Sequence, residues 1–149
     1  MKLLKHIQKF FEIPARERLH MLEALYWLII YTIQIYVMPF RWWQDRIGLK
    51  MQPWKEEALS PRQMQKIGLV RRAVFRARKV LLGFPKCFVL SLTLKKMLQK
   101  RGIESTLYLG VKKGEHQTLI AHAWLKCGDF TVYGGRKANL HYKELVIYT

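Results

Sequence analysis

The residues with the clearest capacity for chemistry are a cysteine and a histidine in the second half of the chain. Cys87 opens a helix-like stretch just after a Gly-Phe-Pro break, and His122 stands in the phrase Ala-His-Ala-Trp on a strand-like run. The free N–H groups at a helix N-terminus lower the pKa of a thiol there, because they favour the nucleophilic thiolate. A histidine on a neighbouring strand can accept the thiol proton. Together the two residues predict a cysteine hydrolase or an acyl-transfer enzyme.

Each residue also has an ordinary structural explanation. A lone cysteine is commonly a buried apolar residue, and a lone histidine on a strand is commonly bonded to a backbone carbonyl. Metal binding is a third explanation, but the available residues lack CxxC or HExxH spacing: His116, His122, Cys127 and His141. Gly134-Gly135 before Arg136-Lys137 is a weak anion-binding signal. We therefore expect neither a metal nor another cofactor.

The elements that must position the pair follow from the spacing of apolar residues. Helical intervals run from Lys86 to Arg101, and Gly102 is suited to end that helix in a left-handed conformation. Alternation predicts strands at 105–111, 118–126 and 130–133, with an edge strand at 144–148. Helices are predicted at 1–13, 15–38 and 61–82, with a short turn or helix at 40–47. The predicted class is α+β, with a catalytic helix on a small antiparallel sheet.

The size of the chain limits its organisation. Its 149 residues suffice for one domain, or for a small catalytic domain with a helical extension. We expect an apolar, basic helical region at 1–60 that serves in docking, and a catalytic core at 61–149. Two cysteines are too few for a disulfide scaffold and fit a reducing compartment. Charged residues interrupt the apolar N-terminus before a signal sequence forms, so we expect a cytoplasmic protein.

The net charge of +17 narrows the partners without choosing among them. Such a field attracts an acidic peptide or protein, anionic lipid head groups or nucleic acid. Nucleic acid is disfavoured, because the aromatic residues cluster in apolar helices and do not alternate with basic residues on strands. A non-enzymatic basic protein that binds a membrane or a partner stays open as an alternative.

The helix predicted at 15–38 is the most apolar part of the chain, and three arrangements suit it. It is long enough to cross a membrane, although His20, Glu23, Thr32 and Gln34 interrupt the apolar run. It also suits a helix buried in the protein, or one that lies against a membrane or partner. Trp42 and Arg41 just beyond it suit an interface.

The order of the motifs resembles the lasso-peptide biosynthesis B proteins, in their free-standing leader-peptidase form. The resemblance rests on Cys-Phe-Val-Leu-Ser-Leu from Cys87, on Arg-Gly-Ile at 101–103, on Leu-Tyr-Leu-Gly-Val at 107–111 and on Ala-His-Ala-Trp at 121–124. Pro-Ala-Arg-Glu-Arg at 14–18 and Pro-Phe-Arg at 39–41 extend it over most of the chain. It implies a transglutaminase-like, papain-like cysteine protease fold.

The resemblance also implies an activity and partners. Proteins of this family remove the leader from a ribosomally made precursor, and a lasso cyclase then joins the freed amine to an acidic side chain. In split systems a separate PqqD-like leader-recognition protein holds the leader. Cys87 would attack the scissile carbonyl, and His122 would activate the thiol and protonate the leaving amine.

One position departs from the family pattern. Many relatives place an aspartate on the third strand where this chain has Gly134. Asn139 and Asp129 are the two candidates for the residue that would orient His122 instead, although Asp129 falls in a predicted hairpin turn. A Cys–His pair aided by water or by a backbone carbonyl is the remaining alternative.

Overall fold

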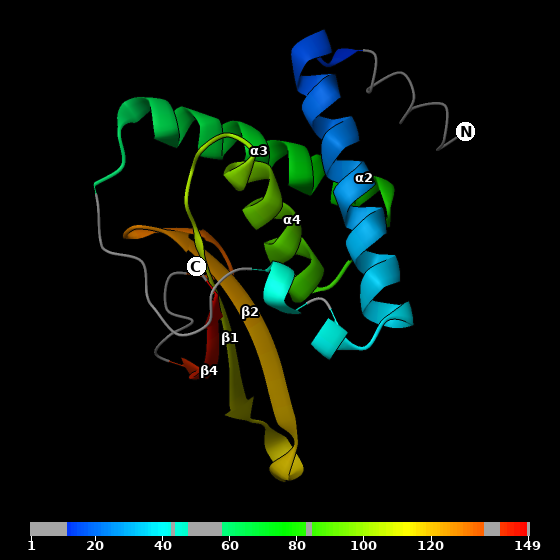
Figure 1. The fold of residues 1–149 in the computed structure, drawn as a ribbon, viewed down its shortest axis with the longest axis vertical. Helices are drawn as coiled ribbons and strands as arrows, with labels where there is room; N and C mark the ends of the chain where they lie inside the picture. Colours follow the sequence, from blue (N-terminus) through cyan, green and yellow to red (C-terminus); the bar gives the residue numbers. More distant parts are fainter. Residues whose placement is uncertain (1–11, 43, 48–57, 83–84, 136–140, 149) are drawn as a thin grey trace.

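The computed structural model describes residues 12–42, 44–47, 58–82, 85–135 and 141–148. Within them, three long helices precede one antiparallel sheet, as Figure 1 shows. The helices are α2 (Ala15–Val37), α3 (Pro61–Val80) and α4 (Cys87–Gln99). The strands are β1 (Thr106–Lys113), β2 (Leu119–Cys127), β3 (Phe130–Tyr133) and β4 (Lys143–Tyr148). This arrangement confirms the predicted α+β class.

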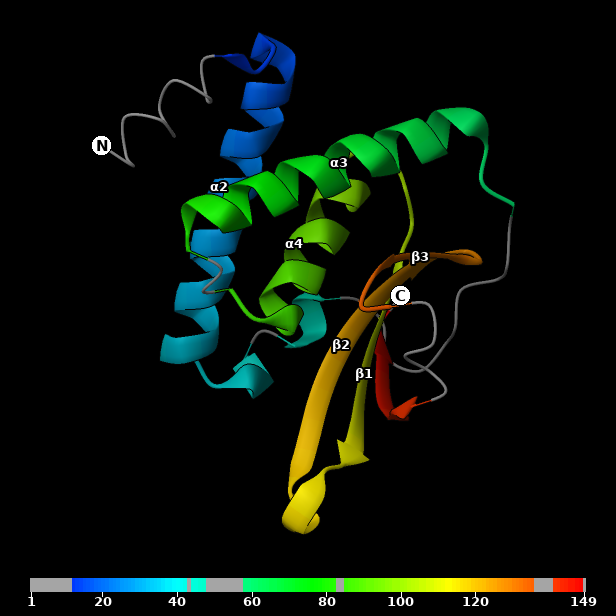
Figure 2. The same ribbon diagram turned by 180° about the vertical axis from the view of Figure 1, so that it is seen from behind.

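The sheet has the strand order β3-β2-β1-β4, so β2 and β1 are its central strands. The long β1–β2 hairpin extends away from the helices, with the short 3-10 turn η3 (Glu115–Gln117) at its tip (Figure 2). β4 pairs with β1 and confirms the predicted edge strand. β3 pairs with β2 only from Leu125 to Cys127. The described residues therefore leave the β2 edge without a paired strand before Leu125.

Local sequence signals set the helix ends. The Ser60 side chain accepts a hydrogen bond from the Gln63 N–H, the Gln63 side chain accepts one from the Ser60 N–H, and Pro61 takes the first helical position of α3. After α4, Gly102 has a φ of +67°, and the Ile103 N–H donates to the Leu98 carbonyl. Both predicted boundary signals are confirmed.

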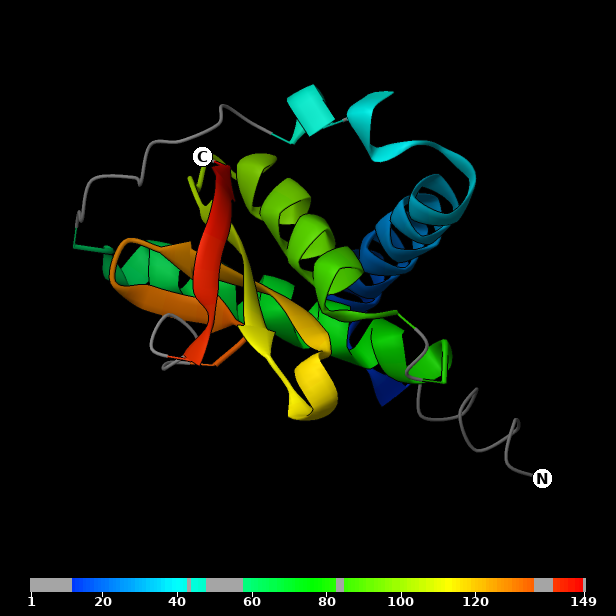
Figure 3. The same cartoon turned by 90° about the horizontal axis from the view of Figure 1, so that it is seen from below.

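Helix α4 is the centre of the core. Figure 3 shows it between α2 and the sheet, with α3 running across behind them. Its residues from Val89 to Leu98 are buried apart from Lys96, which lies at an intermediate depth. A helix that is apolar on nearly every side has to be covered on several sides, and here α2, α3 and β2 cover it.

Helix α2 has two different faces. Met21, Ala24 and Leu28 are buried in the common core. Ion pairs hold the helix in place: Glu17 bonds to Arg76 of α3, and Glu23 bonds to Arg101 after α4. The opposite side, which we name the α2 outer face, is exposed and apolar: Leu19, Leu22, Tyr26, Ile29, Ile30, Ile33, Tyr36 and Val37.

The structure bears on the three arrangements expected for the apolar helix at 15–38 and on the short helices expected beside it. Among the described residues it is the helix with the length and hydropathy to cross a membrane, and 17% of its most apolar window is buried. Such a helix near the N-terminus is weak evidence for a span. Most of the helix predicted at 1–13 lies outside the described residues. The short turn or helix predicted at 40–47 is present as two 3-10 turns, η1 (Phe40–Trp42) and η2 (Gln44–Arg46).

Candidate active site

Cys87 is the first residue of α4. The first hydrogen bond within this turn runs from the Leu90 N–H to the Lys86 carbonyl, so the N–H groups of residues 87–89 have no intrahelical acceptor. No side chain caps this end of the helix. The thiol is half-buried and free of a disulfide. It therefore lies beside free N–H groups that can donate to a negatively charged oxygen of a bound substrate.

His122 is held by a backbone carbonyl. Its Nε2 lies 2.9 Å from the Gly134 oxygen. Because a carbonyl can only accept, Nε2 carries the hydrogen and donates it, which leaves the lone pair of the neutral ring on Nδ1. His122 is thus fixed as the tautomer whose Nδ1 can accept a proton. The carbonyl alternative is the one with a hydrogen bond in the structure.

The backbone at Gly134 explains why no side chain takes this place. Gly134 has a φ of +98°, which L residues rarely adopt, and a Cβ there would lie 2.2 Å from the Trp124 Cβ. An aspartate does not fit this backbone. The absence of the side chain lets the chain approach β2 closely enough for its carbonyl to meet His122.

Tyr133 connects the histidine's surroundings to the thiol. It directly precedes Gly134 and packs against the same core cluster as Cys87. Burial raises the pKa of Tyr133, and the nearby Cys87 thiolate raises it further. Within the described residues no hydrogen bond joins the Cys87 thiol to the His122 ring. Catalytic hydrogen bonds are often long in ligand-free enzymes and shorten when substrate binds.

The two faces of β2 have separate roles. Ala123 and Leu125 belong to the core that contains α4, whereas His122 and Trp124 project to the other side by strand alternation. His122 lies beside the unpaired edge of β2, just beyond the end of β3. An extended peptide could add to this edge through main-chain hydrogen bonds and pass next to the imidazole.

Aromatic residues that the sequence interpretation did not single out surround the imidazole. The Tyr142 ring lies 5.0 Å from the His122 ring, and Trp124 stacks on Tyr108 with the centroids 5.4 Å apart. Gly110 pairs with His122 across the strands, and a Cβ there would meet the Trp124 ring at 2.9 Å. A glycine inside a predicted strand signals such a close approach and could have pointed to this packing.

The other two candidates for the orienting residue are placed differently. Asp129 lies exposed in the turn between β2 and β3. The strand from His122 to Cys127 alone spans about 17 Å at about 3.3 Å per residue, and Asp129 lies beyond its end. Asn139 lies outside the described residues, and its role stays a prediction.

A basic and aromatic wall lies on the α3 side of Tyr133. The Phe75 and Tyr133 ring centroids are 5.9 Å apart, and the Arg71 guanidinium lies 5.7 Å from the Phe75 centroid. A cavity of about 320 Å³ is lined by Phe75, Arg78, Lys79 and Leu82. The buried Nε of Arg78 has no hydrogen-bond partner among the described residues. This wall can accept an apolar side chain together with a carboxylate.

Metal chemistry has no support from the described residues, in which no group of three or more His, Cys, Asp or Glu side chains is placed to hold an ion. Cys127 is buried, and burial raises the pKa of its thiol to about 12, so it stays protonated at neutral pH. Cys87 is therefore the described cysteine placed for nucleophilic chemistry.

The structure has a free thiol at the start of α4 and a carbonyl-bound histidine on the sheet that packs against this helix, and these are the residue types that a cysteine hydrolase or acyltransferase uses. Comparison with known protein families agrees with this class. The chain belongs to the transglutaminase-like superfamily, whose core domain matches residues 27–147. The match begins inside α2, so the second half of that helix is part of the matched region along with the sheet. No curated protein and no solved structure matches the chain.

Proposed function

We propose that this protein is the leader peptidase of a lasso-peptide pathway. It removes the leader from a ribosomally made precursor and acts with a PqqD-like leader-recognition protein and a lasso cyclase. The single observation that supports the catalytic part most strongly is His122, fixed by the Gly134 carbonyl on the sheet that packs against the Cys87 helix. The assignment of the substrate rests on the motif resemblance that starts at Cys87 and ends in Ala-His-Ala-Trp.

The first step requires bound substrate to bring the Cys87 thiol and the His122 ring together, because the two are not hydrogen-bonded among the described residues and His122 alternates to the face of β2 away from α4. The Nδ1 of His122 then accepts the thiol proton. The thiolate attacks the scissile carbonyl carbon, and a C–S bond forms while the carbonyl electron pair moves to oxygen. The free N–H groups at the start of α4 can donate to this oxyanion. The Gly134 carbonyl stabilises the imidazolium through Nε2.

In the second step the tetrahedral intermediate collapses and the C–N bond breaks. The imidazolium Nδ1–H protonates the departing amine, which is the new N-terminus of the core peptide. The leader remains as a thioester on Cys87. A water molecule, deprotonated by Nδ1, then attacks this thioester and restores the thiol.

Two surfaces support an extended peptide as the substrate. The free edge of β2 offers main-chain hydrogen-bonding groups beside His122. The cavity between Phe75 and Leu82, with Arg78 and Lys79 in its wall, suits an acidic side chain of the peptide. The net charge of +17 favours the approach of such a substrate.

The proposal places the reaction in the cytoplasm, where precursors are made. The exposed outer face of α2 supports a role in docking, since contiguous apolar surface of this size commonly marks an interface. A membrane surface is the second candidate for that face.

The test is incubation with the cognate precursor and its recognition protein, followed by mass spectrometry of the products. We expect the wild type to release the free leader and the core peptide. Cys87→Ala and His122→Ala should each abolish cleavage while retaining the thermal unfolding transition. Leu145→Ala, at an exposed position of β4, serves as the control and should cleave normally.

The same experiment separates the alternatives. Unchanged cleavage by Cys87→Ala would falsify the peptidase proposal. Transfer of the leader to an added amine in preference to water would assign an acyltransferase, because a thioester reacts with either. Absence of any Cys87-dependent product would favour a non-enzymatic binding protein.

A further inference from the structure

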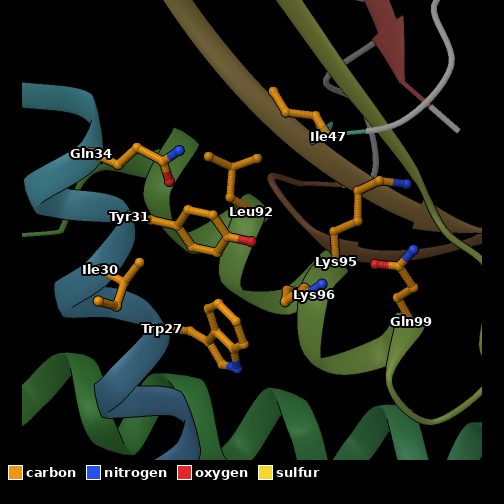
Figure 4. Close-up of a pocket in the computed structure, with 9 residues that line it drawn as sticks. All are labelled: Trp27, Ile30, Tyr31, Gln34, Ile47, Leu92, Lys95, Lys96 and Gln99. Carbon is orange, nitrogen blue, oxygen red and sulfur yellow. The ribbon is translucent and has the colours of Figure 1, made fainter. Parts of the chain in front are cut away.

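A pocket of about 290 Å³ lies between α2 and α4, as Figure 4 shows. Neither Cys87 nor His122 lines it. Its main walls are Trp27, Tyr31 and Gln34 of α2 and Leu92, Lys96 and Gln99 of α4. The rings of Trp27 and Tyr31 project from α2 towards the α4 side chains. The catalytic steps make no use of this site.

We propose that this pocket and the α2 outer face together form the docking site for an acidic, amphipathic segment of a partner protein. A large apolar side chain of that segment fills the pocket, and its carboxylates lie beside the lysines of α4. The proposal deepens the proposed function, because it gives the expected partner a location and a chemistry.

The size of the pocket favours a side chain over a small molecule. Small-molecule sites are typically about 300–1,000 Å³, so this volume is at the lower limit. Its floor is aromatic and aliphatic, from Trp27, Tyr31 and Leu92. Interfaces concentrate their binding energy in such places, where one aromatic or aliphatic anchor enters a preformed pocket.

The pocket is continuous with a long apolar surface. Ile30 both lines the pocket and belongs to the α2 outer face. That face runs from Leu19 to Val37, which is about 27 Å at about 1.5 Å per residue. Its side chains recur at intervals of three and four, the spacing that an amphipathic helix in a groove would match.

The charges around this surface favour an acidic partner. The Lys96 amine lies 5.5 Å from the Trp27 ring, and both side chains line the pocket, whereas the Lys100 amine, 6.0 Å from the same ring, is paired with Glu23. The two acidic residues of α2, Glu17 and Glu23, are paired with basic side chains, so they do not repel a carboxylate. Complementary charge at the rim mainly raises the association rate and excludes wrong partners.

The polar groups of the pocket favour a protein segment over a lipid surface. The side-chain amides of Gln34 and Gln99 and the Tyr31 hydroxyl line the pocket, and none of the three makes a hydrogen bond to another of the described residues. A peptide backbone can satisfy such groups, whereas hydrocarbon chains cannot. The inner face of α2 also packs on α3, which has seven basic residues and no acidic one, so α2 cannot enter a bilayer core and keep this packing.

The test is a binding measurement on the full chain carrying Cys87→Ala, so that cleavage does not interfere. The probes are two fluorescein-labelled 16-residue peptides with the same Leu and Trp stripe, flanked by Glu in one and by Lys in the other. We expect the Glu peptide to bind about tenfold more tightly, and Ile30→Glu to weaken it by at least tenfold. Leu145→Glu, at an exposed position of β4, is the matched control and should bind like its parent.

Equal affinity for the two peptides, or an unchanged Kd in Ile30→Glu, overturns the proposal. Ile33→Glu, at a more exposed position of the same face, serves if Ile30→Glu does not fold. A third outcome also overturns the proposal: the protein binds neither peptide but sediments with phosphatidylglycerol vesicles, and Ile30→Glu abolishes this sedimentation. That result would assign the α2 outer face to a membrane. Because the protein is catalytically inactive throughout, these outcomes are independent of whether the precursor is cleaved.

Discussion

Replacing Gly134 by alanine tests how His122 is oriented. The new Cβ would stand 2.2 Å from the Trp124 Cβ, whereas two carbon atoms normally approach to about 3.5–4.0 Å. The backbone at 134 must therefore move by about 1.5 Å. The hydrogen bond from His122 is 2.9 Å long, and such bonds weaken strongly beyond about 3.2 Å. A movement of this size breaks it.

The magnitude follows from the loss of a fixed imidazole. A displacement of about 1 Å in a catalytic arrangement can lower the rate by about 100-fold. We therefore expect kcat/KM of Gly134→Ala to fall by about two orders of magnitude, or about 2.7 kcal/mol of transition-state stabilisation. The strained φ adds a loss of about 1–3 kcal/mol in the free energy of unfolding.

The chain contains a matched control for this substitution. Gly135 has a similar φ of +92°, but a Cβ there meets nothing within 4 Å. Gly135→Ala should therefore lower stability by a similar amount and leave kcat/KM nearly unchanged. The assay is precursor cleavage followed by mass spectrometry, at a temperature where both variants are folded. Equal activity of the two variants would refute the carbonyl-orientation argument.

Three further predictions concern stability, measured by urea unfolding. Leu28→Ala on the inner face of α2 should lower the free energy of unfolding by about 2–5 kcal/mol. Ile33→Ala on the outer face should change it by less than about 1 kcal/mol. Equal losses in the two variants would contradict the packing of α2. Burial raises the pKa of Glu23, but the hydrogen bonds and positive charges of Arg101 and Lys100 together outweigh it and hold this pKa below 4.5. The ion pairs of Glu23 therefore stabilise the fold above pH 4.5, and this stabilisation is lost as the pH falls through the lowered pKa. Arg101→Met should therefore lower the free energy of unfolding at pH 7, and this free energy should fall less steeply towards pH 3 than that of the wild type. Parallel pH profiles of the variant and the wild type would contradict this. Burial lowers the pKa of Lys95 from 10.5 to about 8, so the unfolded chain binds more protons than the folded one between these pH values. The free energy of unfolding of the wild type, relative to that of Lys95→Met, should therefore rise from pH 8 to 10. A difference that does not change with pH would contradict the burial of the amine.

The sequence predicted most of the fold because its signals are local. The Ser60 cap, Pro61 at the start of α3 and Gly102 after α4 depend on neighbouring residues alone, and each was found where expected. The strand ranges followed from the alternation of residue types, although β2 buries both of its faces at Ala123, Trp124 and Leu125. Helix α2 was different, since a helix that is apolar all round does not indicate which side is covered.

The site divides in the same way. The sequence by itself determined the candidate nucleophile and base, Cys87 and His122, because a thiol after a Gly-Phe-Pro break and a histidine in a strand are local features. It also marked Gly134 as the position where an acid was expected. Only the tertiary structure decided what replaces that acid: a positive φ beside Trp124 brings the Gly134 carbonyl to His122. A hydrogen bond to a backbone oxygen leaves no trace in residue types, because every residue carries the same carbonyl and its position depends on the folded chain.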